Sequence, residues 1–430
     1  MSTVGFVALG KLGLPVAVAM AERGHTVIGT DVNQEMLDRY RKGVSNLYEP
    51  NMDERLQKQL TDGRLLLTSD LKTVVKESEI IFIAVQTPHP PELDGSIRFN
   101  HVRKDFDYMF LQKSCNDIAE IINDCENYKV VVIISTVLPG TTRDRLYPEM
   151  QTHCSKKIGH GWDLIYSPSF IAMGQTISDF VEPEFTLVGE RIRKSVAGDM
   201  VEKFYKSIHD SPIMRMTWAE AEGVKCWYNL YIGQKIMFAN TVMHLCHNLG
   251  ANCDMVTDAL VKATDRLISP KYLKGGNVDA GGCHPRDNLA MSYISDELGL
   301  GYNVFDFMMT VREKHVEWFA DEIQKAMQSS DQQVVIMGRT YKPFTNLTYG
   351  SASLLLYNIL LERGIEPVFY DPETDPILPD KRPSVYFIGT NWPQFRTFDY
   401  CANSTVIDPW GMITDKADDV TLVSLGRKER

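Results

Sequence analysis

The chain has 430 residues, of which 44% are hydrophobic and 23% are charged, and its formal net charge at pH 7 is −11. This length predicts two or three domains, each with its own core. The acidic balance argues against nucleic acid as a partner, because phosphate backbones attract basic surfaces. A phosphorylated small molecule stays compatible, since it needs only a local cluster of cations and backbone N–H groups.

Targeting and disulfide signals are missing from the sequence. The N-terminal residues have no basic start before an apolar run, so no signal peptide is expected. No apolar stretch approaches the ~20 residues that span a bilayer, and no membrane partner is expected. The eight cysteines have no paired spacing, which speaks against a disulfide framework or a metal site. We expect a cytoplasmic protein.

In the first half of the chain, short β-branched runs alternate with helical patterns, as in a doubly wound parallel sheet. One helix is expected at residues 12–23. The predicted strands cover residues 4–9, 26–30, 79–85, 129–135 and 163–166.

The pattern changes in the middle of the chain. No proline interrupts residues 218–248, and Gly250 follows, which predicts one long helix. At ~30 residues such a helix is ~45 Å long, and it would serve as a spine between domains and as a dimer surface.

After a helix expected at residues 311–327, the α/β pattern returns, with a helix at 353–363. Strands are predicted at residues 333–337, 366–370, 384–388, 405–407 and 421–424. The fold class is therefore α/β, with two Rossmann-like doubly wound domains joined by a long central helix. We expect a cofactor domain at residues 1–210, a helical domain at 211–325 and a second Rossmann-like domain at 326–430.

A candidate phosphate-binding loop follows the first predicted strand. Gly10 and Gly13 fit the pattern G-x-G-x-x-G, although Ala8 replaces its first glycine. Glycines here let the backbone approach a pyrophosphate at a helix N-terminus. Asp31 ends the next strand, where a carboxylate accepts hydrogen bonds from the ribose of NAD and would repel the extra phosphate of NADP. The alternative is a glycine turn that binds nothing, with Asp31 as a strand-end cap.

The most informative stretch is D-A-G-G-C-H-P-R-D at residues 279–287, with Cys283 after two glycines. It resembles the nucleophile loop of the UDP-glucose and GDP-mannose dehydrogenase family. Further similar motifs follow in order along nearly the whole chain: Y-E-P at 48–50, G-R-L at 63–65, A-V-Q-T-P at 84–88, S-T-V-L-P-G-T-T at 135–142, A-E-G-V-K at 221–225, T-Y-K-P at 340–343 and T-N-W-P-Q-F at 390–395.

The resemblance implies a homodimeric NAD-dependent enzyme. It would oxidise the C6 alcohol of a nucleoside-diphosphate sugar, with a UDP-sugar as the first expectation, to a uronic acid in two hydride transfers. Cysteine chemistry suits this reaction, because an aldehyde yields hydride only after a nucleophile adds to it. Without the resemblance, Cys283 could be a small buried apolar residue and Lys225 an exposed helix lysine.

The resemblance also assigns the site residues. Cys283 would be the nucleophile, Lys225 would stabilise charge on the sugar oxygen, and Asn229, Asp287 and Thr136 would hold the lysine and a water. The cofactor would contact Gly10, Lys11, Leu12, Asp31, Val85, Thr87, Ser135 and Thr136. The substrate would contact Ser169, Phe170, Ile171, Lys225, Asn229, Arg266, Tyr272, Leu273, Gly282 and Lys342.

The sequence departs from the family pattern at several positions. Ser169 stands where the family has the glutamate that activates water for thioester hydrolysis, and a serine hydroxyl is a poor base. Asp179 and Glu184 are alternative acids nearby. The glycine loop is one residue shorter before Cys283. Tyr349 and Trp410 replace two expected arginines, and Trp410 could stack on a base or sugar or pack in the domain interface.

These departures leave alternatives to a complete oxidation. A two-electron variant would stop at the aldehyde or at the thioester. A paralogue without catalysis would bind nucleotide sugar or NAD, although it would have no need of a thiol nucleophile. A hydroxyacid or hydroxyacyl-CoA dehydrogenase of related fold would use a catalytic His or Lys without a cysteine loop.

Overall fold

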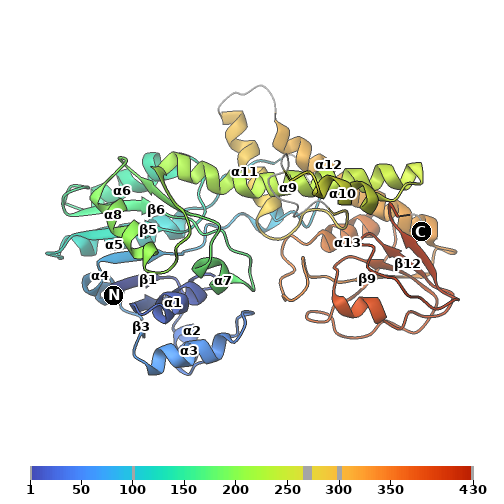
Figure 1. Ribbon diagram of the computed structural model, residues 1–430, viewed down its shortest axis with the longest axis horizontal. Helices are drawn as coiled ribbons and strands as arrows, with labels where there is room; N and C mark the ends of the chain where they lie inside the picture. The colour runs from blue at the N-terminus through green and yellow to red at the C-terminus, as the bar shows by residue number, and fades with distance from the viewer. Residues whose placement is uncertain (1, 99–101, 265–273, 298–302, 428–430) are drawn as a thin grey trace. The chain divides into compact units, whose positions relative to one another are not determined.

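A computed structural model describes residues 2–98, 102–264, 274–297 and 303–427. The chain forms two compact units, Met1–Pro88 with Phe106–Trp227 and His89–Asp105 with Tyr228–Arg430. Each unit contains one β-sheet with helices packed on it (Figure 1). The predicted α/β class with two Rossmann-like sheets is confirmed, whereas the predicted domain boundaries at residues 210 and 325 stay predictions.

The sheet of the first unit has eight strands in the order β3-β2-β1-β4-β5-β6-β7-β8. Strands β1 to β6 are mutually parallel, β7 runs antiparallel to β6, and β8 is parallel to β7. The strand order reverses between β1 and β4, and ligands bind at such a switch point. The strands are β1 (Thr3–Val7), β2 (Thr26–Thr30), β3 (Leu65–Thr68), β4 (Ile80–Ile83), β5 (Lys129–Ile133), β6 (Trp162–Tyr166), β7 (Thr186–Glu190) and β8 (Ile213–Thr217).

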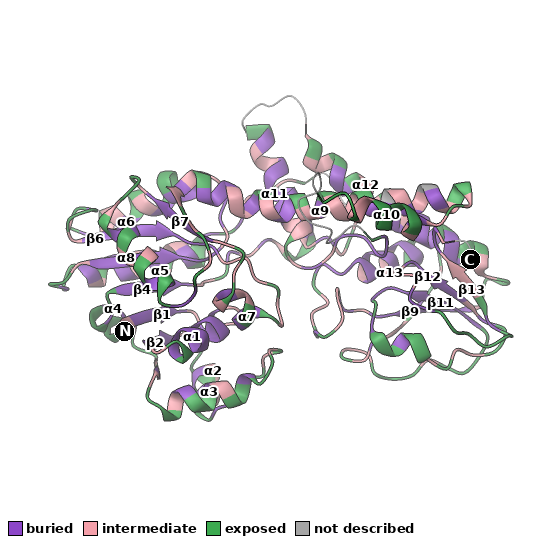
Figure 2. Cartoon of the chain, in the orientation of Figure 1, coloured by how far each residue is buried: buried purple, intermediate pink, exposed green. Residues whose placement is uncertain are grey.

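Helices cover both faces of this sheet, because successive β1 residues point to opposite sides. Val4 and Phe6 join the core under α1 (Gly13–Glu22), α2 (Gln34–Arg41), α3 (Met52–Thr61), α7 (Thr176–Val181) and α8 (Val196–Lys206). Gly5 faces the other side, where a Cβ would lie 2.8 Å from the Val74 side chain. Here α4 (Leu71–Glu77) packs beside α5 (Met109–Ile122), and α5 beside α6 (Tyr147–His153). Strands β1, β2 and β4 to β7 are buried along nearly their whole length, whereas the edge strands β3 and β8 are partly exposed (Figure 2).

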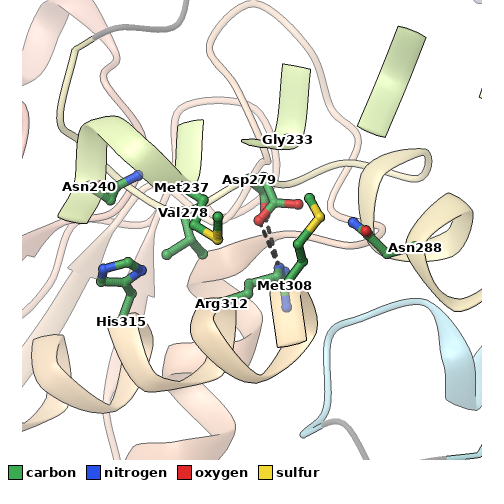
Figure 3. Close-up of a pocket in the computed structure, with 9 residues that line it drawn as sticks. All are labelled: Gly233, Met237, Asn240, Val278, Asp279, Asn288, Met308, Arg312 and His315. Atoms are coloured by element: carbon green, nitrogen blue, oxygen red, sulfur yellow. Dashed lines mark hydrogen bonds and ion pairs between the residues drawn. The ribbon is translucent and has the colours of Figure 1, made fainter. Parts of the chain in front are cut away.

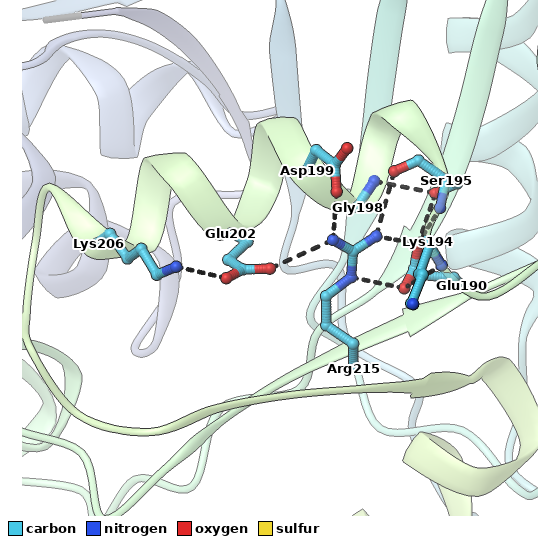
Figure 4. A network of polar contacts seen from close by, with 8 residues as sticks. All are labelled: Glu190, Lys194, Ser195, Gly198, Asp199, Glu202, Lys206 and Arg215. Carbon is cyan, nitrogen blue, oxygen red and sulfur yellow. Dashed lines mark hydrogen bonds and ion pairs between the residues drawn. The ribbon is translucent and has the colours of Figure 1, made fainter.

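An ion-pair network closes the far end of the sheet (Figure 4). The fully buried Glu190 of β7 accepts hydrogen bonds from Nε and Nη2 of Arg215 in β8, at 2.7 and 2.6 Å. Ser195 caps α8 and also donates to Glu190 at 2.7 Å. A side chain at Gly198 would collide with both charged groups. The network thus ties β7, β8 and α8 together by paired hydrogen bonds on one buried carboxylate.

The long helix α9 (Trp218–Leu249) matches the prediction, and the boundary between the two units falls within it. Short helix α10 (Cys253–Val261) and α11 (His284–Glu297) follow. Helix α12 (Val304–Ala326) begins earlier than predicted, because the Asn303 side chain accepts the Asp306 N–H as an N-cap.

The second unit contains a parallel sheet in the order β10-β9-β11-β12-β13. One face packs on α12, α13 (Ala352–Glu362) and the end of α9, and includes Val334 and Ile336. The other face includes Val335 and Met337 and packs on Trp392 and the 3-10 helix η3 (Pro393–Thr397). The strands are β9 (Gln333–Met337), β10 (Val368–Tyr370), β11 (Ser384–Ile388), β12 (Thr405–Asp408) and β13 (Thr421–Ser424). Within the described residues, no helix is long and apolar enough to cross a bilayer.

Candidate active site

The loop after β1 has the strained backbone of a phosphate-binding turn. Ala8 has φ +74°, in the left-handed region that favours glycine. A Cβ at Gly13 would lie 1.9 Å from the Ala8 carbonyl oxygen, so this position excludes any side chain. At Gly10 a Cβ would meet no heavy atom within 4 Å. The two glycines therefore differ: Gly13 lets α1 pack on the loop, and Gly10 leaves open space above it. Lys11 is exposed and Leu12 is half-buried.

Asp31 follows β2 and lies beside this loop. Its carboxylate accepts the Leu9 N–H at 2.8 Å and the Asn33 N–H at 2.9 Å. It is only half-buried, so accepting capacity remains toward solvent. Tyr40 donates to the Leu9 carbonyl at 3.1 Å and holds the loop from below. The carboxylate is fixed in place and still open to a ligand hydroxyl.

In the second sheet an aspartate also follows a strand and accepts main-chain N–H groups, but this aspartate is fully buried. Asp371 follows β10 and accepts the N–H groups of Arg339 and Thr340 after β9, at 2.7 and 2.9 Å. It is fully buried and accepts a further bond from Trp392 Nε1 at 3.3 Å. Asp371 therefore braces the turn after β9, and no ligand can reach it.

Strands β4 and β5 bring four further predicted cofactor residues to the same sheet edge. Ser135 Oγ donates to the Val85 carbonyl at 2.5 Å, and Thr87 Oγ1 donates to the Thr136 carbonyl at 2.7 Å. These bonds join the segments that follow β4 and β5. The cofactor residues predicted after β1, β2, β4 and β5 therefore line one continuous edge.

Lys225 on α9 lies next to the predicted substrate segment that follows β6. Its Nζ donates to the Ser169 carbonyl at 2.7 Å and sits 5.0 Å from the centre of the Phe170 ring. Ile171 packs against the core of the first unit. Because the bond goes to the main chain, the Ser169 side chain is not needed to hold the lysine.

Sequence reasoning did not single out Glu222, although it lies in the A-E-G-V-K motif. Its fully buried carboxylate accepts the N–H groups of Gly140 and Thr142 at 2.6 and 2.8 Å. Burial raises the pKa of Glu222 to about 7, against the opposing effect of these hydrogen bonds. Glu222 thus ties the first turns of α9, which carry Lys225, to the turn that contains Thr136.

Cys283 is the one exposed cysteine of the eight; Cys401 is half-buried and the other six are buried. It directly precedes α11, and its carbonyl accepts the Asp287 N–H at 2.8 Å. By contrast, burial raises the pKa of Cys253 to about 11, so that thiol is poorly reactive. Exposure distinguishes Cys283 from the other seven cysteines, whereas a place at a helix N-terminus is shared with the buried Cys253, which begins α10.

A buried polar cluster stands one turn beyond Cys283. Asp287 is fully buried, and its Oδ2 accepts the Asn229 side-chain amide at 2.8 Å. Its Oδ1 accepts two bonds from Arg286, at 3.1 and 3.0 Å. The structure therefore brings Asn229 and Asp287 together, with Arg286 as a partner that sequence reasoning missed.

Three aromatic rings lie against the glycines of the cysteine loop. A Cβ at Gly281 would be 2.9 Å from the Tyr341 ring, and one at Gly282 would be 2.8 Å from the Tyr349 ring. The Trp410 ring leaves no room for a side chain at Gly276, and its Nε1 donates to the Ile388 carbonyl at 3.0 Å. The Trp410 ring therefore packs within the second unit, and its stacking on a base or sugar stays a prediction. Lys342 lies 5.7 Å from the Tyr341 ring centre.

Arg266, Tyr272 and Leu273, which we expected to contact substrate, lie outside the described residues. Among the described residues, no three His, Cys, Asp or Glu side chains are grouped to hold a metal ion.

Comparison with known proteins identifies the family. Residues 2–209 match the NAD binding domain of the UDP-glucose/GDP-mannose dehydrogenase family, and residues 219–314 match its central domain. The chain belongs to this family of NAD-dependent oxidoreductases.

Its relatives include GDP-mannose 6-dehydrogenase of Pseudomonas aeruginosa, 28% identical over 86% of this chain and 80% of the relative. A UDP-glucose 6-dehydrogenase of Bacillus subtilis is 26% identical over 86% of this chain and 76% of its own length. The solved UDP-glucose dehydrogenase of Pyrobaculum islandicum superposes with a TM-score of 0.86 at 26% identity, and covers 99% of this chain and 98% of its own.

Proposed function

We propose that this protein oxidises the C6 alcohol of a nucleoside-diphosphate sugar with NAD, through Cys283. A UDP-sugar is the first candidate. A GDP-sugar is the next, since UDP- and GDP-sugar dehydrogenases both occur among the relatives. The observation that carries the proposal is the state of Cys283: an exposed thiol at the start of α11, one turn from the buried Asp287–Asn229 pair.

The residues of the first unit fit NAD. Asp31 has accepting capacity for ribose hydroxyls, Gly10 leaves open space at the loop, and α1 begins directly behind it. A carboxylate at position 31 disfavours the 2′-phosphate of NADP. When bound, NAD supplies the hydride acceptor for the reaction.

The chain itself supplies the nucleophile and the charged groups. Oxidation of the alcohol removes a hydride and the hydroxyl proton and gives an aldehyde. Cys283 Sγ then bonds to the aldehyde carbon, and the thiol proton passes to the oxygen. Loss of a second hydride and of that proton gives a thioester. Water finally displaces the thiol and leaves the carboxylate. Lys225 would stabilise negative charge on the substrate oxygen.

The hydrolytic step needs a base that Ser169 does not provide. Ser169 and Asp179 line the same pocket in the first unit, with a volume of about 20 Å³, which leaves room for a water molecule. Asp179 Oδ2 also accepts the Ala172 N–H at 2.8 Å, which holds the carboxylate in place. Of the two acids considered, Asp179 is therefore the better candidate, and Glu184 does not line this pocket.

The second candidate function is the two-electron variant, and the serine at position 169 is the observation that favours it. The test is to offer purified protein NAD and a panel of UDP-, GDP- and TDP-sugars while NADH release and product mass are recorded. Two NADH per sugar and a carboxylate support the full reaction. One NADH, or a burst with sugar mass on Cys283, supports the variant.

The Cys283→Ser variant is the control for both candidate functions, the full oxidation and the two-electron reaction. The proposal requires that it form no thioester adduct and release no acid. If Cys283→Ser turns over as fast as the wild type, the cysteine mechanism is wrong. If the wild type shifts its melting temperature with a nucleotide sugar but never releases NADH, the protein is a binding paralogue.

We also propose that a second copy of the chain binds along α9. Trp227, Tyr231 and Phe238 are 55%, 45% and 47% exposed, and their spacing places them on one face of the helix. Exposed large aromatic residues in a row are typical of protein interfaces. Light scattering after size exclusion should give a dimer mass, and Tyr231→Glu should give a monomer.

A further inference from the structure

The cysteine loop is fixed by close backbone contacts on two sides. Gly281 N–H donates to the Gly350 carbonyl at 3.1 Å, and a Cβ at Gly350 would lie 2.4 Å from the Gly281 oxygen. On another side, Gly95 has φ +81°, and a Cβ there would lie 2.5 Å from the Pro285 side chain. Pro285 stands two residues after Cys283. The position of the thiol therefore depends on the segments around Gly95 and Gly350.

One buried guanidinium holds the cysteine loop and the Gly95 segment together, and Figure 3 shows its position beside Asp279. Arg312 of α12 is 2% exposed. Its Nε donates to the main-chain carbonyl of Asp279 at 3.0 Å, at the start of the cysteine loop. Its Nη1 donates to the carbonyl of Gly95 at 2.9 Å. The same side chain thus fixes the loop and the segment that packs on Pro285.

The geometry of these bonds is specific to arginine. The two acceptors are carbonyls from segments far apart in the sequence, and a planar fork with fixed N–H directions reaches both at once. A lysine has a single nitrogen and would lose at least one of them. The Asp279 carboxylate lies 3.7 Å from Arg312 Nε and balances its charge.

The free energy of folding does not explain a buried guanidinium at position 312. Burial of an unpaired guanidinium is strongly unfavourable, and well-packed apolar residues often replace buried ion pairs without loss of stability. In addition, among the described residues Arg312 Nη2 has no hydrogen-bond partner. The adjoining cavity, lined by Met237, Asn240, Met308 and His315, has a volume of only about 10 Å³, too small for more than one water.

We propose that Arg312 is a positioning residue for the cysteine loop: it fixes the backbone at Asp279 and Gly95, and thereby the place of Cys283. The inference rests on the proposed role of Cys283 as nucleophile. Misplacement of a reacting group by ~1 Å costs on the order of 100-fold in rate, even when substrate binding is retained. Arg312 should therefore affect kcat far more than KM.

The test compares Arg312→Ala and Arg312→Lys with the matched control Arg363→Ala. Arg363 also contacts α12, through Asp321 and Gln324 at 2.7 and 2.6 Å, but these bonds lie outside the cysteine loop. We expect Arg312→Ala to lower kcat about 100-fold with both KM values changed less than about threefold. Guanidinium at about 20 mM should restore at least about tenfold of that loss, because this concentration is far below the molar range that unfolds proteins. Methylammonium should not restore it.

Alkylation of Cys283 by iodoacetamide provides a readout that needs no substrate. We expect its rate in Arg312→Ala to differ from the wild-type rate at least threefold, to return with guanidinium, and to be unchanged in Arg363→Ala. If the proposed function is wrong, the wild type releases no NADH. The alkylation rates then test the positioning role of Arg312 by themselves. Unchanged kcat and alkylation in Arg312→Ala, or losses that guanidinium does not restore, would overturn the inference.

Discussion

The side-chain amide of Asn229 donates a 2.8 Å hydrogen bond to Asp287, joining the middle of α9 to the first turn of α11. Asp287 is fully buried and also receives both bonds from Arg286, so its two oxygens are each occupied by a different partner. These bonds hold the first turn of α11, which Cys283 directly precedes, against α9.

Asp287→Asn is therefore expected to damage both stability and turnover. An asparagine has one acceptor and one donor group, so it cannot serve Asn229 and Arg286 together. We expect the free energy of unfolding to fall by roughly 2–3 kcal/mol and turnover to fall on the order of 100-fold. Urea titration and NADH release measure the two effects.

The matched control is Asp254→Asn. Asp254 accepts Arg427 Nε at 2.7 Å in the same unit, and Arg427 donates its other side-chain bonds to the carbonyls of Gly275, Pro409 and Leu425, not to residues 279–287. It should lose stability and keep turnover. Equal losses of turnover in the two variants would mean that the Asp287 cluster has no special role.

Ser169→Glu should accelerate acid release. The substitution places a carboxylate in the pocket that Ser169 shares with Asp179, and a positioned general base contributes on the order of 10²–10⁴ in rate. We expect the hydrolysis of the Cys283 thioester to quicken at least about tenfold. Quenched-flow mass spectrometry of the adduct measures it. If hydrolysis is unchanged, and Asp179→Asn abolishes it, Asp179 already serves as the base.

Ala8→Gly should stabilise the first unit. A left-handed conformation costs an L-residue roughly 1–2 kcal/mol, and the added freedom of glycine in the unfolded chain offsets about half of that. The expected gain is about 0.5–1 kcal/mol in urea unfolding. Ala17→Gly within α1 is the control and should destabilise by about 1 kcal/mol. A loss of stability at both positions would show that Ala8 carries no strain.

Glu222 should make stability depend on pH near neutrality. Its pKa is raised from 4.5 to about 7 in the folded state. The folded form therefore holds a proton that the unfolded form has released, and this contribution is present below pH 4.5 and lost as pH rises through 7. Its full size is of the order of 3 kcal/mol.

The measurement is the difference in unfolding free energy between Glu222→Gln and the wild type. The difference should move in favour of the variant between pH 5 and pH 8, by a few kcal/mol. Subtraction matters because burial lowers the pKa of His315 to about 4, which acts in the opposite direction at acid pH. Glu313→Gln is a positive control. Burial also raises the pKa of Glu313 to about 7, in the other unit, so the difference for this variant should change with pH in the same direction. A pH-independent difference for Glu222→Gln would contradict the assignment.

Sequence patterns predicted many of the strands, but complete burial did not decide which ones: the partly exposed β13 was predicted at both ends, whereas the fully buried β7 was missed. The strands at Thr26–Thr30, Gln333–Met337 and Ser384–Ile388 agree with prediction at both ends, because their apolar runs are bounded by turns. The long helix α9 differs by one residue. Strands β7 and β8 were missed: β7 includes a glycine and a buried glutamate, and β8 carries an arginine that pairs with it. Glu190 and Arg215 pair with each other and with Ser195, Asp199 and Glu202 of the α8 segment, and local patterns do not reveal these contacts.

The candidate site shows the same limit. The motifs located Cys283, Lys225 and the cofactor loop, because each is a local signal. Arg312 gave no such signal, since its two acceptors come from residues 95 and 279 and meet only in the fold. The left-handed backbone at Ala8 was equally hidden, because the alanine itself suggests no strain.

The contrast between one exposed thiol and six buried ones has a consequence for oxidative conditions. Peroxide converts an accessible cysteine to sulfenic acid, while burial protects six of the other seven. Oxidant should therefore abolish activity without unfolding the protein. A thiol reductant should restore the activity as long as oxidation has gone no further than sulfenic acid. Once the half-buried Cys401 is replaced, the same property allows a single electrophilic label to be placed at residue 283 with the six buried cysteines left in the chain.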